Sequence, residues 1–422
     1  MASPAGLACV RCGAAYPISR YAVDCERCRG EAPANLTVTY APDAFAGITR
    51  GAVASGPLTL WRYAAFLPVD ARDAVSLGEG LTPLVPAPRL GAAFGARLYV
   101  KDESRNPTWS FKDRLATVVV SAARTLGARV IASSSSGNAG AAVAAYAARA
   151  GLPCVVFTFQ AAAGPMVTQM RAYGALVVAV RDKADRWKLL EAGVQRFGWF
   201  PTSPFVAPVV GSNPLGIEGY KTLAYEIAEQ LDWQAPDWCV LPVCYGDALY
   251  GVWKGFEDLR RLGWIARSPR LVAAEIYGSL AATLAAGGDR LLDVPKTHDS
   301  IAASIGATQS TYQALHALRA SRGVAVAIRD DELMTWQARM AAEEGLYAEP
   351  SSVAPVAAVQ RLRADGAIGR DDSVVAVITA GGLKDPAPTA RHQGDVPVVP
   401  ADLDAALDTL RSVYGVTLGD DA

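Results

Sequence analysis

Four cysteines near the start of the chain have the spacing of a tetrahedral metal site. Cys9, Cys12, Cys25 and Cys28 are arranged as C-x2-C-x12-C-x2-C. Two intervening residues allow both thiolates of one tight turn to face the same ion, and a second such turn completes the coordination shell. In a reducing compartment this spacing favours zinc over disulfides. Because four thiolates leave no open position, we expect a structural zinc site; the alternative is a degenerate ribbon that no longer holds metal.

A lysine at the start of a predicted helix is the second candidate for chemistry. Lys112 lies between Phe111 and Asp113, in a segment whose composition is otherwise suited to burial. Burial disfavours the charged ammonium, which lowers the pKa of the lysine and makes its amine a better nucleophile. The alternative is an ordinary lysine at a helix start, paired with Asp113.

A serine-rich turn has the composition of a ligand-binding loop. It runs from Ser133 to Ser136 and continues with Gly137 and Asn138. Its small residues let backbone N–H groups approach a ligand closely, and the end of the following helix favours an anion. Asn138 adds both a donor and an acceptor. The alternative is an ordinary capped helix start after a polar turn.

Two further segments have residues suited to a cofactor. One is a turn with a single central glycine, made of Cys244, Tyr245, Gly246, Asp247, Ala248 and Leu249. Its spacing fits a loop that cradles a phosphate, although one glycine does not by itself identify such a loop. The other is Thr379, which ends a predicted strand ahead of a glycine pair and is therefore placed to touch a ring in a cleft.

These segments lie where short apolar runs meet alanine-rich helical runs. We predict strands over residues 97–100, 129–132, 155–159, 176–180, 238–243, 270–275 and 374–378. We predict helices over residues 113–126, 139–150 and 165–173. Strands that alternate with helices in this way predict a doubly wound α/β architecture with buried parallel strands. Ligands of such sheets bind beyond the carboxyl ends of the strands, which is where the turns described above fall.

Composition excludes several classes of protein. The 422 residues are 51% apolar, and 40 basic against 41 acidic residues leave a formal charge of −1. That length and apolar share allow a large core and two to three domains, and the charge does not indicate a nucleic-acid partner. Because no apolar run approaches the roughly 20 residues of a membrane span and the first residues lack an export signal, we expect a soluble, cytoplasmic protein with no membrane partner.

Several short motifs follow one another along the chain: 61–63 (WRY), 77–84 (LGEGLTPL), 101–103 (KDE), 110–114 (SFKDR), 136–138 (SGN), 218–222 (EGYKT) and 382–385 (GLKD). This ordered set resembles the fold type II pyridoxal-phosphate enzymes, in particular their threonine synthase-like branch. The resemblance covers nearly the whole chain, and a subset of these proteins carries a similar cysteine ribbon.

The fold implied by the resemblance is tryptophan synthase β-like, with two doubly wound parallel-sheet subdomains and a small N-terminal zinc ribbon. We expect the ribbon over residues 1–33 and the catalytic region over residues 34–422. Within that region the implied smaller subdomain spans about 115–212, and the larger one combines about 60–114 with 213–400.

The resemblance also implies a role for each chemistry-bearing segment. Lys112 forms a Schiff base with pyridoxal phosphate and later moves a proton, and Asn138 bonds the 3′-oxygen of the cofactor. Backbone amides of the turn from Cys244 to Leu249 hold the cofactor phosphate. Thr379 contacts the pyridine nitrogen; because a hydroxyl cannot stabilise a protonated ring as a carboxylate does, elimination and replacement are favoured over transamination. The residues implied in substrate binding are Ser133, Ser134, Ser135, Ser136, Gly137 and Trp109.

Several positions depart from the pattern of threonine synthases. Gly216, in the segment 213–216 (NPLG), stands where these enzymes place the arginine that grips the phosphate of O-phosphohomoserine. Loss of such a charge-assisted contact costs roughly 1.5–3 kcal/mol or more. Residues 139–141 (AGA) replace a turn that favours hydroxyl groups. Cys244 replaces a glycine and is expected to pack rather than react; Trp109 fills a small position, where its indole narrows the pocket or stacks on substrate.

We therefore expect a pyridoxal-phosphate-dependent lyase that performs β- or γ-elimination or replacement on an amino acid, without phosphate-dependent chemistry. The alternatives are an authentic threonine synthase that converts O-phosphohomoserine to threonine, and deamination of serine or threonine. A remote alternative is a non-catalytic scaffold of the same fold. The resemblance also implies a homodimer, which no feature of the sequence independently indicates.

Overall fold

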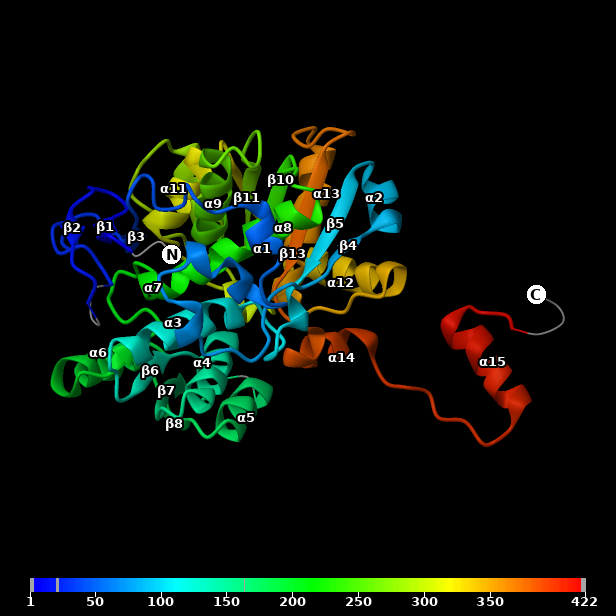
Figure 1. Cartoon of the computed structure of the whole chain (residues 1–422). Coiled ribbons are helices and arrows are strands. Elements are labelled where there is room, and N and C mark those ends of the chain that lie inside the picture. Colours follow the sequence, from blue (N-terminus) through cyan, green and yellow to red (C-terminus); the bar gives the residue numbers. More distant parts are fainter. Residues whose placement is uncertain (1–3, 20–22, 163, 419–422) are drawn as a thin grey trace. The chain divides into compact units, whose positions relative to one another are not determined.

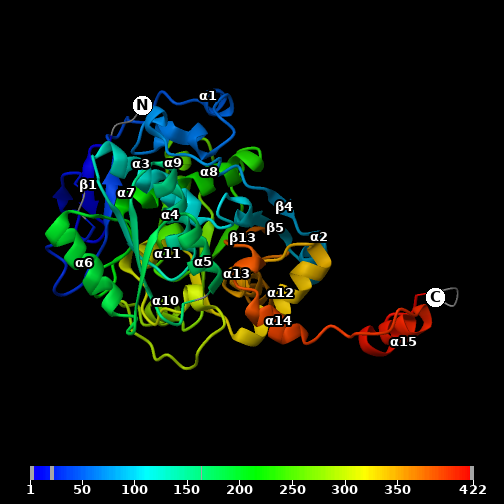
Figure 2. The ribbon, with the colours of Figure 1, turned by 90° about the horizontal axis from the view of Figure 1, so that it is seen from below.

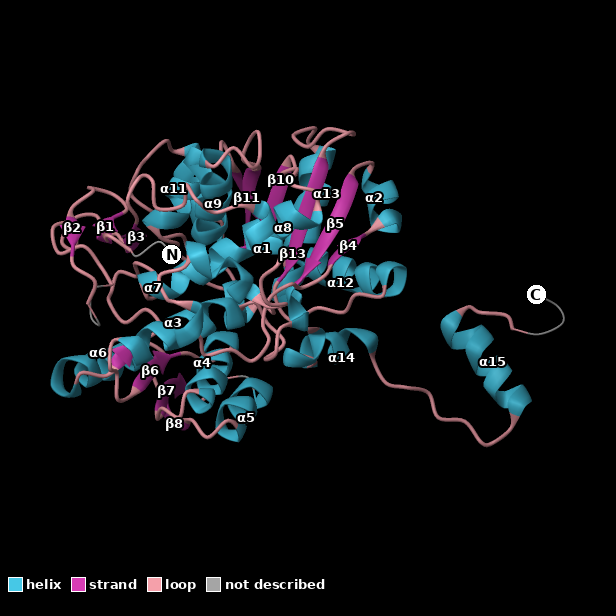
Figure 3. Ribbon diagram, in the orientation of Figure 1, coloured by secondary structure: helices cyan, strands magenta, loops and turns pink. Residues whose placement is uncertain are grey.

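The computed structural model describes residues 4–19, 23–162 and 164–418, which divide into two compact units. The first, Met1–Asp385, contains three β-sheets with helices packed on them (Figures 1 and 3). The second, Pro386–Ala422, contains α14 (Ala387–Gln393) and α15 (Leu403–Tyr414). Within the described ranges, no helix combines the length and the apolar character that a bilayer crossing requires.

The larger sheet has six strands in the order β12-β11-β10-β13-β5-β4. Their bounds are β4 Leu84–Pro86, β5 Arg97–Asp102, β10 Trp238–Pro242, β11 Arg270–Glu275, β12 Val324–Ala327 and β13 Ser373–Ile378. All neighbouring strands are parallel except the edge strand β4, which is antiparallel to β5. The central strands β10 and β13 are buried along nearly their whole length, which explains why they read as continuous apolar runs.

Helices cover both faces of this sheet. They are α2 Pro88–Phe94, α8 Lys221–Gln230, α9 Asp247–Arg261, α10 Ser279–Ala285, α11 Tyr312–Ala320, α12 Asp330–Glu344 and α13 Pro350–Ala364. Val240 and Val374 pack in one core with α2, α12 and α13, whereas Cys239 and Val375 pack in another with α8, α9 and α11. Because successive strand residues point to opposite faces, this alternation produces the doubly wound arrangement.

The smaller sheet has four parallel strands in the order β8-β7-β6-β9. Their bounds are β6 Ile131–Ser134, β7 Cys154–Phe159, β8 Leu176–Val180 and β9 Phe200–Pro201. The associated helices are α3 Lys112–Thr125, α4 Asn138–Arg149, α5 Gly164–Ala172 and α6 Asp185–Phe197. Val156 belongs to the core with α4 and α5, and Phe157 to the core with α6, so helices cover both faces of this sheet too. Figure 2 shows α6 apart from α4 and α5.

The N-terminal segment forms a small antiparallel sheet in the order β2-β1-β3. Its strands are β1 Gly6–Cys9, β2 Ala15–Tyr16 and β3 Leu36–Thr39. The short helices α1 Arg50–Ala54 and α7 Pro214–Ile217 are the remaining α-helices of the described residues. Leu7 and Leu36 of this sheet pack with Trp61 and Leu215, so the ribbon shares a hydrophobic core with the rest of its unit.

The structure confirms the predicted doubly wound α/β fold, and each predicted strand and helix has a counterpart. Differences lie at the element ends. The strand predicted over residues 129–132 spans Ile131–Ser134, because its pairing with β7 begins at Ile131. The helices predicted to begin at residues 113 and 139 begin one residue earlier, at Lys112 and Asn138. Both chemistry-bearing side chains therefore belong to the first turns of helices.

Candidate active site

Backbone contacts place Lys112 beside the carboxyl end of β13. The N–H of Phe111 donates to the carbonyl of Thr379 at 2.8 Å, and Ser110 forms an antiparallel bridge with Ala380. The turn before it is closed by the N–H of Trp109, which donates to the carbonyl of Asn106 at 2.7 Å. The lysine is therefore held where parallel strands of the larger sheet end, the position at which doubly wound folds bind ligands.

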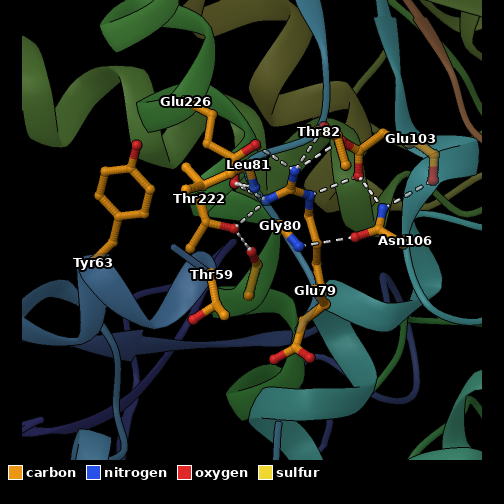
Figure 4. Close-up of polar contacts among 12 residues, drawn as sticks. Thr59, Tyr63, Glu79, Gly80, Leu81, Thr82, Glu103, Asn106, Thr222 and Glu226 are labelled. Atoms are coloured by element: carbon orange, nitrogen blue, oxygen red, sulfur yellow. Dashed lines mark hydrogen bonds and ion pairs between the residues drawn. The ribbon is translucent and has the colours of Figure 1, made fainter. Parts of the chain in front are cut away.

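A network of buried charges anchors the helix that begins with Lys112. Arg114 is fully buried and pairs with Glu103 and Glu226, at 2.6 Å each. Its guanidinium also donates to Thr222 at 2.9 Å. Figure 4 shows Thr82, Glu103, Thr222 and Glu226 gathered around this set of contacts. Because each charge is paired and hydrogen-bonded, the network holds the first turn of α3 in one position without leaving a buried charge uncompensated.

Asp113 does not pair with Lys112. Its carboxylate accepts hydrogen bonds from the N–H of Thr108, at 2.7 Å, and from the Thr108 hydroxyl, at 2.5 Å. Burial raises the pKa of Asp113 to about 7, although the bonds from Thr108 favour its charged form. The alternative interpretation of Lys112, as a helix-start lysine paired with Asp113, is therefore not what the structure shows.

The Lys112 amine lies in surroundings that favour its neutral form. Burial lowers the pKa of Lys112, and the nearby Asp247, Cys244 and Glu349 oppose that shift only in part. Nζ lies 4.7 Å from the centre of the Phe111 ring, and among the described residues it has no hydrogen-bond or ion-pair partner. A lowered pKa and the lack of a partner both make the amine more available as a nucleophile.

Asn138 and the serine turn lead into the first turn of α4. The Asn138 amide donates to both carboxylate oxygens of Glu349, at 3.2 Å each. Its own Oδ1 is buried and has no partner among the described residues. The Ser135 hydroxyl accepts from the N–H of Gly140 at 2.9 Å and of Gly137 at 3.3 Å, so it caps the helix.

The remaining serines divide between strand and turn. Ser133 and Ser134 belong to β6, and their hydroxyls are buried without a partner in the described part of the chain. Ser136 and Gly137 are only partly buried. A ligand that reaches this end of β6 would therefore meet hydroxyls with unmet hydrogen-bonding capacity.

The turn that links β10 to α9 has the geometry of an anion site. Gly246 precedes α9 with a φ of 75°, and a Cβ there would lie 2.3 Å from the Cβ of Ala314. Only glycine satisfies both constraints. The carboxylate of Asp247 accepts a hydrogen bond from the Ser212 hydroxyl at 2.6 Å, which stabilises its negative charge. The first N–H groups of α9 have no acceptor within the helix and are suited to a phosphate.

The Thr379 hydroxyl is oriented by a partner on α13. Its Oγ1 lies 2.8 Å from the Oγ of Ser352, which also accepts from the N–H of Ala380 at 2.9 Å. Because Ser352 accepts that backbone hydrogen bond, its own proton is available for Thr379. Thr379 is buried directly after β13, at the carboxyl end of this central strand.

Cys244 and Trp109 differ in their surroundings. Burial raises the pKa of the Cys244 thiol to about 11, which keeps it protonated at neutral pH and favours packing over nucleophilic catalysis. Trp109 has a φ of 64°, rare for a residue with a side chain, and 58% of its surface is exposed. Strain of this kind concentrates at functional sites.

Gly216 is enclosed by α3. A Cβ at this position would lie 2.9 Å from the Cβ of Val119 and 3.0 Å from the Cγ of Leu115. An arginine side chain could not leave this backbone position without moving α3 away from α7. The glycine therefore belongs to a close helix contact, and the position supplies no cation to the site.

Sequence reasoning missed two titratable groups at the site, Glu349 and Lys384. Burial raises the pKa of Glu349 to about 7, and burial lowers the pKa of Lys384 to about 8. The Lys384 amine donates to the carbonyl of Thr108 at 3.2 Å and to Gln169. The available signal for Glu349 was a carboxylate directly before Pro350, at the start of an otherwise apolar helix.

The four predicted metal ligands lie together. The Sγ atoms of Cys9, Cys12, Cys25 and Cys28 are all within 4.8 Å of one another. The N–H groups of Arg11 and Cys12 point to the Sγ of Cys9, at 3.3 and 3.4 Å, as expected for a thiolate held by a tight turn. Soft thiolates in a tetrahedral group of four suit zinc.

The site as a whole fits a phosphorylated aldehyde cofactor. Four buried polar atoms without partners among the described residues belong to the predicted ligand-binding segments or to the turn before Lys112: Ser110 Oγ, Ser133 Oγ, Ser134 Oγ and Asn138 Oδ1. In native proteins such atoms are normally bonded, and a ligand at these segments would satisfy them. With a lysine whose pKa is lowered by burial and a helix start suited to an anion, fold and site define an α/β enzyme of the class that binds such a cofactor covalently.

Comparison with known proteins identifies the family. Residues 75–380 match the family described as pyridoxal-phosphate dependent enzyme. The chain belongs to this family and is therefore a pyridoxal-phosphate-dependent enzyme.

Curated relatives of similar length carry one name. The threonine synthase of Methanosarcina acetivorans is 34% identical over 416 residues, covering 97% of this chain and 98% of that protein. The threonine synthase of Methanocaldococcus jannaschii is 33% identical over 386 residues, covering 90% and 92%. That of Mycobacterium tuberculosis is 35% identical over 359 residues, covering 84% and 96%.

Solved structures agree on the fold. Maize serine racemase superposes with a TM-score of 0.63 at 19% identity, covering 74% of this chain and 93% of that chain. O-ureido-L-serine synthase superposes with a TM-score of 0.60 at 26% identity, covering 77% and 96%. The predicted resemblance to fold type II pyridoxal-phosphate enzymes, with relatives among threonine synthases, is confirmed.

Proposed function

We propose that this chain is a threonine synthase-like lyase that eliminates or replaces a group at Cβ or Cγ of an amino acid, and that it does not depend on a phosphate leaving group. The observation that carries this proposal is the packing of Gly216 against Val119 and Leu115. It removes the cation expected to grip a substrate phosphate and leaves no room for that side chain.

Each predicted residue has a task suited to its surroundings. Bound pyridoxal phosphate supplies an electron sink for the pair released when a substrate proton leaves. Lys112 would hold the cofactor through Nζ and, because burial lowers the pKa of the amine and so favours its neutral form, would accept and return the substrate's α-proton. The N–H groups at the start of α9 hold the phosphate. Asn138 bonds the ring oxygen, and Thr379 contacts the ring nitrogen with a hydroxyl already oriented by Ser352.

The substrate carboxylate is assigned to the end of β6 and the first turn of α4. The N–H groups of the turn and the helix end favour an anion there, and the unpartnered hydroxyls of Ser133 and Ser134 add donors. Trp109 stands exposed close to Lys112 in sequence and is proposed to contact the substrate side chain.

Two alternative reactions remain candidates, each with its own support. Synthesis of threonine from O-phosphohomoserine is supported by relatives of that name at 33–35% identity over most of the chain. Deamination of serine or threonine is supported by the hydroxyl, rather than carboxylate, at position 379.

Substrate assays separate these reactions. The enzyme is incubated with O-phosphohomoserine while phosphate and threonine are measured, and in parallel its absorbance is followed with serine, threonine and O-acylated homoserine. We expect spectral change with one of the latter and no phosphate release. Stoichiometric phosphate and threonine would establish the synthase reaction instead.

We also propose that the four cysteines bind one structural zinc ion. Their mutual distances and the N–H groups directed to Cys9 support this assignment. The homodimer and the cytoplasmic location stay predictions from the sequence.

A further inference from the structure

The carbonyl groups of the anion-binding turn are held by two neighbouring hydroxyls. Ser310 Oγ donates to the carbonyl of Cys244 at 3.0 Å, and Thr311 Oγ1 donates to the carbonyl of Tyr245 at 2.6 Å. In a planar trans peptide the C=O and the next N–H point in opposite directions. Fixing these carbonyls therefore directs the N–H groups of Tyr245 and Gly246 away from the hydroxyls and presents them as donors.

The next residues of the same segment hold the first residue of α9. Gln313 Nε2 donates to Asp247 Oδ1 at 2.6 Å. This bond pairs the carboxylate of Asp247, the first residue of α9, with a hydrogen-bond donor. Gly211 borders the contact with a φ of 128°, and a Cβ there would lie 2.4 Å from Gln313 Nε2 and 2.8 Å from Asp247 Oδ1. The packing is close enough that displacement of Gln313 must disturb Asp247.

The cysteine ribbon holds this segment from its other side. Asn35, directly before β3 of the ribbon, is fully buried and donates to Gln313 Oε1 at 3.1 Å. The Asn35 carbonyl accepts from the N–H of Val10, which lies in the first cysteine turn. The Arg11 guanidinium in that turn lies 3.7 Å from the centre of the Tyr312 ring. Residues 310–313 thus contact the anion turn on one side and the ribbon on the other.

We propose that Ser310–Gln313 is a positioning segment for the cofactor phosphate, and that Asn35 and Arg11 fasten it, so that the ribbon contributes to cofactor affinity. This inference rests on the proposed function, in which the turn from Cys244 to Leu249 holds the phosphate. Ser310, Thr311 and Gln313 need not touch the cofactor, because each acts through its hydrogen bond to the turn. The effect must be specific to the phosphate, so pyridoxal, which lacks it, serves as the internal reference.

Binding of the two ligands to full-length, cofactor-free protein tests the proposal. Thr311→Val removes the hydroxyl and keeps the shape, and Asn35→Ala removes the ribbon's amide. Absorbance or fluorescence titrations measure the affinity for pyridoxal phosphate and for pyridoxal. Because one hydrogen bond is removed, we expect about a tenfold loss for pyridoxal phosphate with Thr311→Val. Affinity for pyridoxal should change by less than about twofold. Thr311→Ser keeps the hydroxyl and should bind pyridoxal phosphate as tightly as the wild type does.

Two matched variants complete the design. Thr125→Val removes a hydroxyl that likewise donates to a backbone carbonyl, that of Ser121 at 3.1 Å, but within α3; it should leave both affinities unchanged. Arg11→Met tests the ribbon near the surface if Asn35→Ala does not fold, and it should weaken pyridoxal phosphate binding severalfold while metal content stays the same.

The outcomes distinguish this inference from the proposed function. If the wild-type protein binds pyridoxal phosphate no better than pyridoxal, the turn does not hold the phosphate and the proposed site is wrong. If the wild type prefers pyridoxal phosphate but Thr311→Val keeps the same preference, the positioning segment is refuted and the site stands. Equal losses for both ligands refute it as well, because they indicate general loosening. An unchanged preference in both ribbon variants refutes the ribbon's contribution.

Discussion

The side-chain amide of Asn138 bridges both oxygens of the Glu349 carboxylate, at 3.2 Å each. Asn138 begins α4, which packs on the smaller sheet, and Glu349 directly precedes α13, which packs on the larger one. The bond therefore joins helices of the two sheets at the predicted cofactor site. It also occupies the amide hydrogens of Asn138 and leaves Oδ1 as the unpartnered atom of that side chain.

The pKa of Glu349 predicts a pH dependence of stability. Burial raises this pKa from 4.5 to about 7, so the folded protein binds the proton more tightly than the unfolded chain does. Stability must then fall as pH rises from about 4.5 through 7. Glu349→Gln removes this effect, and we expect the variant to exceed the wild type by up to about 3 kcal/mol above pH 7. Urea denaturation at pH 5 and pH 8 measures the difference. An equal difference at both pH values would contradict the prediction.

Replacing Lys112 should separate stability from activity. The amine has no polar partner among the described residues, and its pKa is lowered. Charging the amine therefore disfavours the folded state at pH values below its ordinary pKa. We expect Lys112→Met to raise the unfolding free energy by about 1–3 kcal/mol at pH 7 and to abolish turnover. Borohydride reduction followed by mass spectrometry should place a pyridoxyl group on Lys112 in the wild type only. An adduct on another residue, or none, would overturn the assignment.

Arg114→Met should destabilise the protein strongly. It leaves the carboxylates of Glu103 and Glu226 buried beside an apolar side chain, and removal of one partner from such a network costs about 3–5 kcal/mol. Arg72→Met provides the control, because Arg72 pairs with Asp70 on the surface and such pairs contribute at most about 1 kcal/mol. Chemical denaturation compares the two, and similar losses would show that the buried network does not anchor α3.

Trp109→Gly should increase stability and weaken substrate binding. A residue with a side chain at a φ of 64° carries about 1–2 kcal/mol of strain that glycine avoids. If the exposed indole contacts the substrate, KM should rise about tenfold with a smaller change in kcat, since a lost contact of about 1.4 kcal/mol has that effect. Steady-state kinetics on the substrate found by the assays above and thermal denaturation provide the readouts. An unchanged KM would assign Trp109 no part in recognition.

Metal analysis tests the cysteine ribbon. We expect one zinc ion per chain and its loss in Cys25→Ser, because Cys25 is buried in the cluster. Strong chelation should expose the N-terminal ribbon to proteases while the remaining core stays folded. Given the contacts of Asn35 and Arg11, it should also lower affinity for pyridoxal phosphate without affecting pyridoxal. Wild-type protein purified without any bound metal would contradict the zinc assignment.

The fold was accessible from the sequence because its signals are local. Apolar runs such as residues 374–378 are long enough to be recognised as buried strands, and alanine-rich stretches such as residues 139–150 indicate helices. Cys9, Cys12, Cys25 and Cys28 follow one another at fixed spacing, so their cluster was also predictable. Lys112 became a candidate because a lysine in an apolar segment is itself a local anomaly, and the resemblance to pyridoxal-phosphate enzymes then implied its role.

The supporting residues could not be found in the same way. Glu349 is 211 positions from Asn138, and Thr311 is 66 positions from the carbonyl it holds. No periodicity or spacing connects such pairs, because their proximity results from how the sheets and helices pack. The same holds for Gly216: its absent side chain was visible in the sequence, but the contact with α3 that closes the position was not.

The sequence by itself determined the alternation of strands and helices, the cysteine spacing and the candidate for the reactive amine, since each depends on neighbouring residues and on which side chains are apolar. Only the tertiary structure decided which buried groups face that amine, which donors orient the anion-binding turn, and that the ribbon contacts the segment behind it. These relationships depend on distances between elements far apart in the chain, which the close packing of the interior sets.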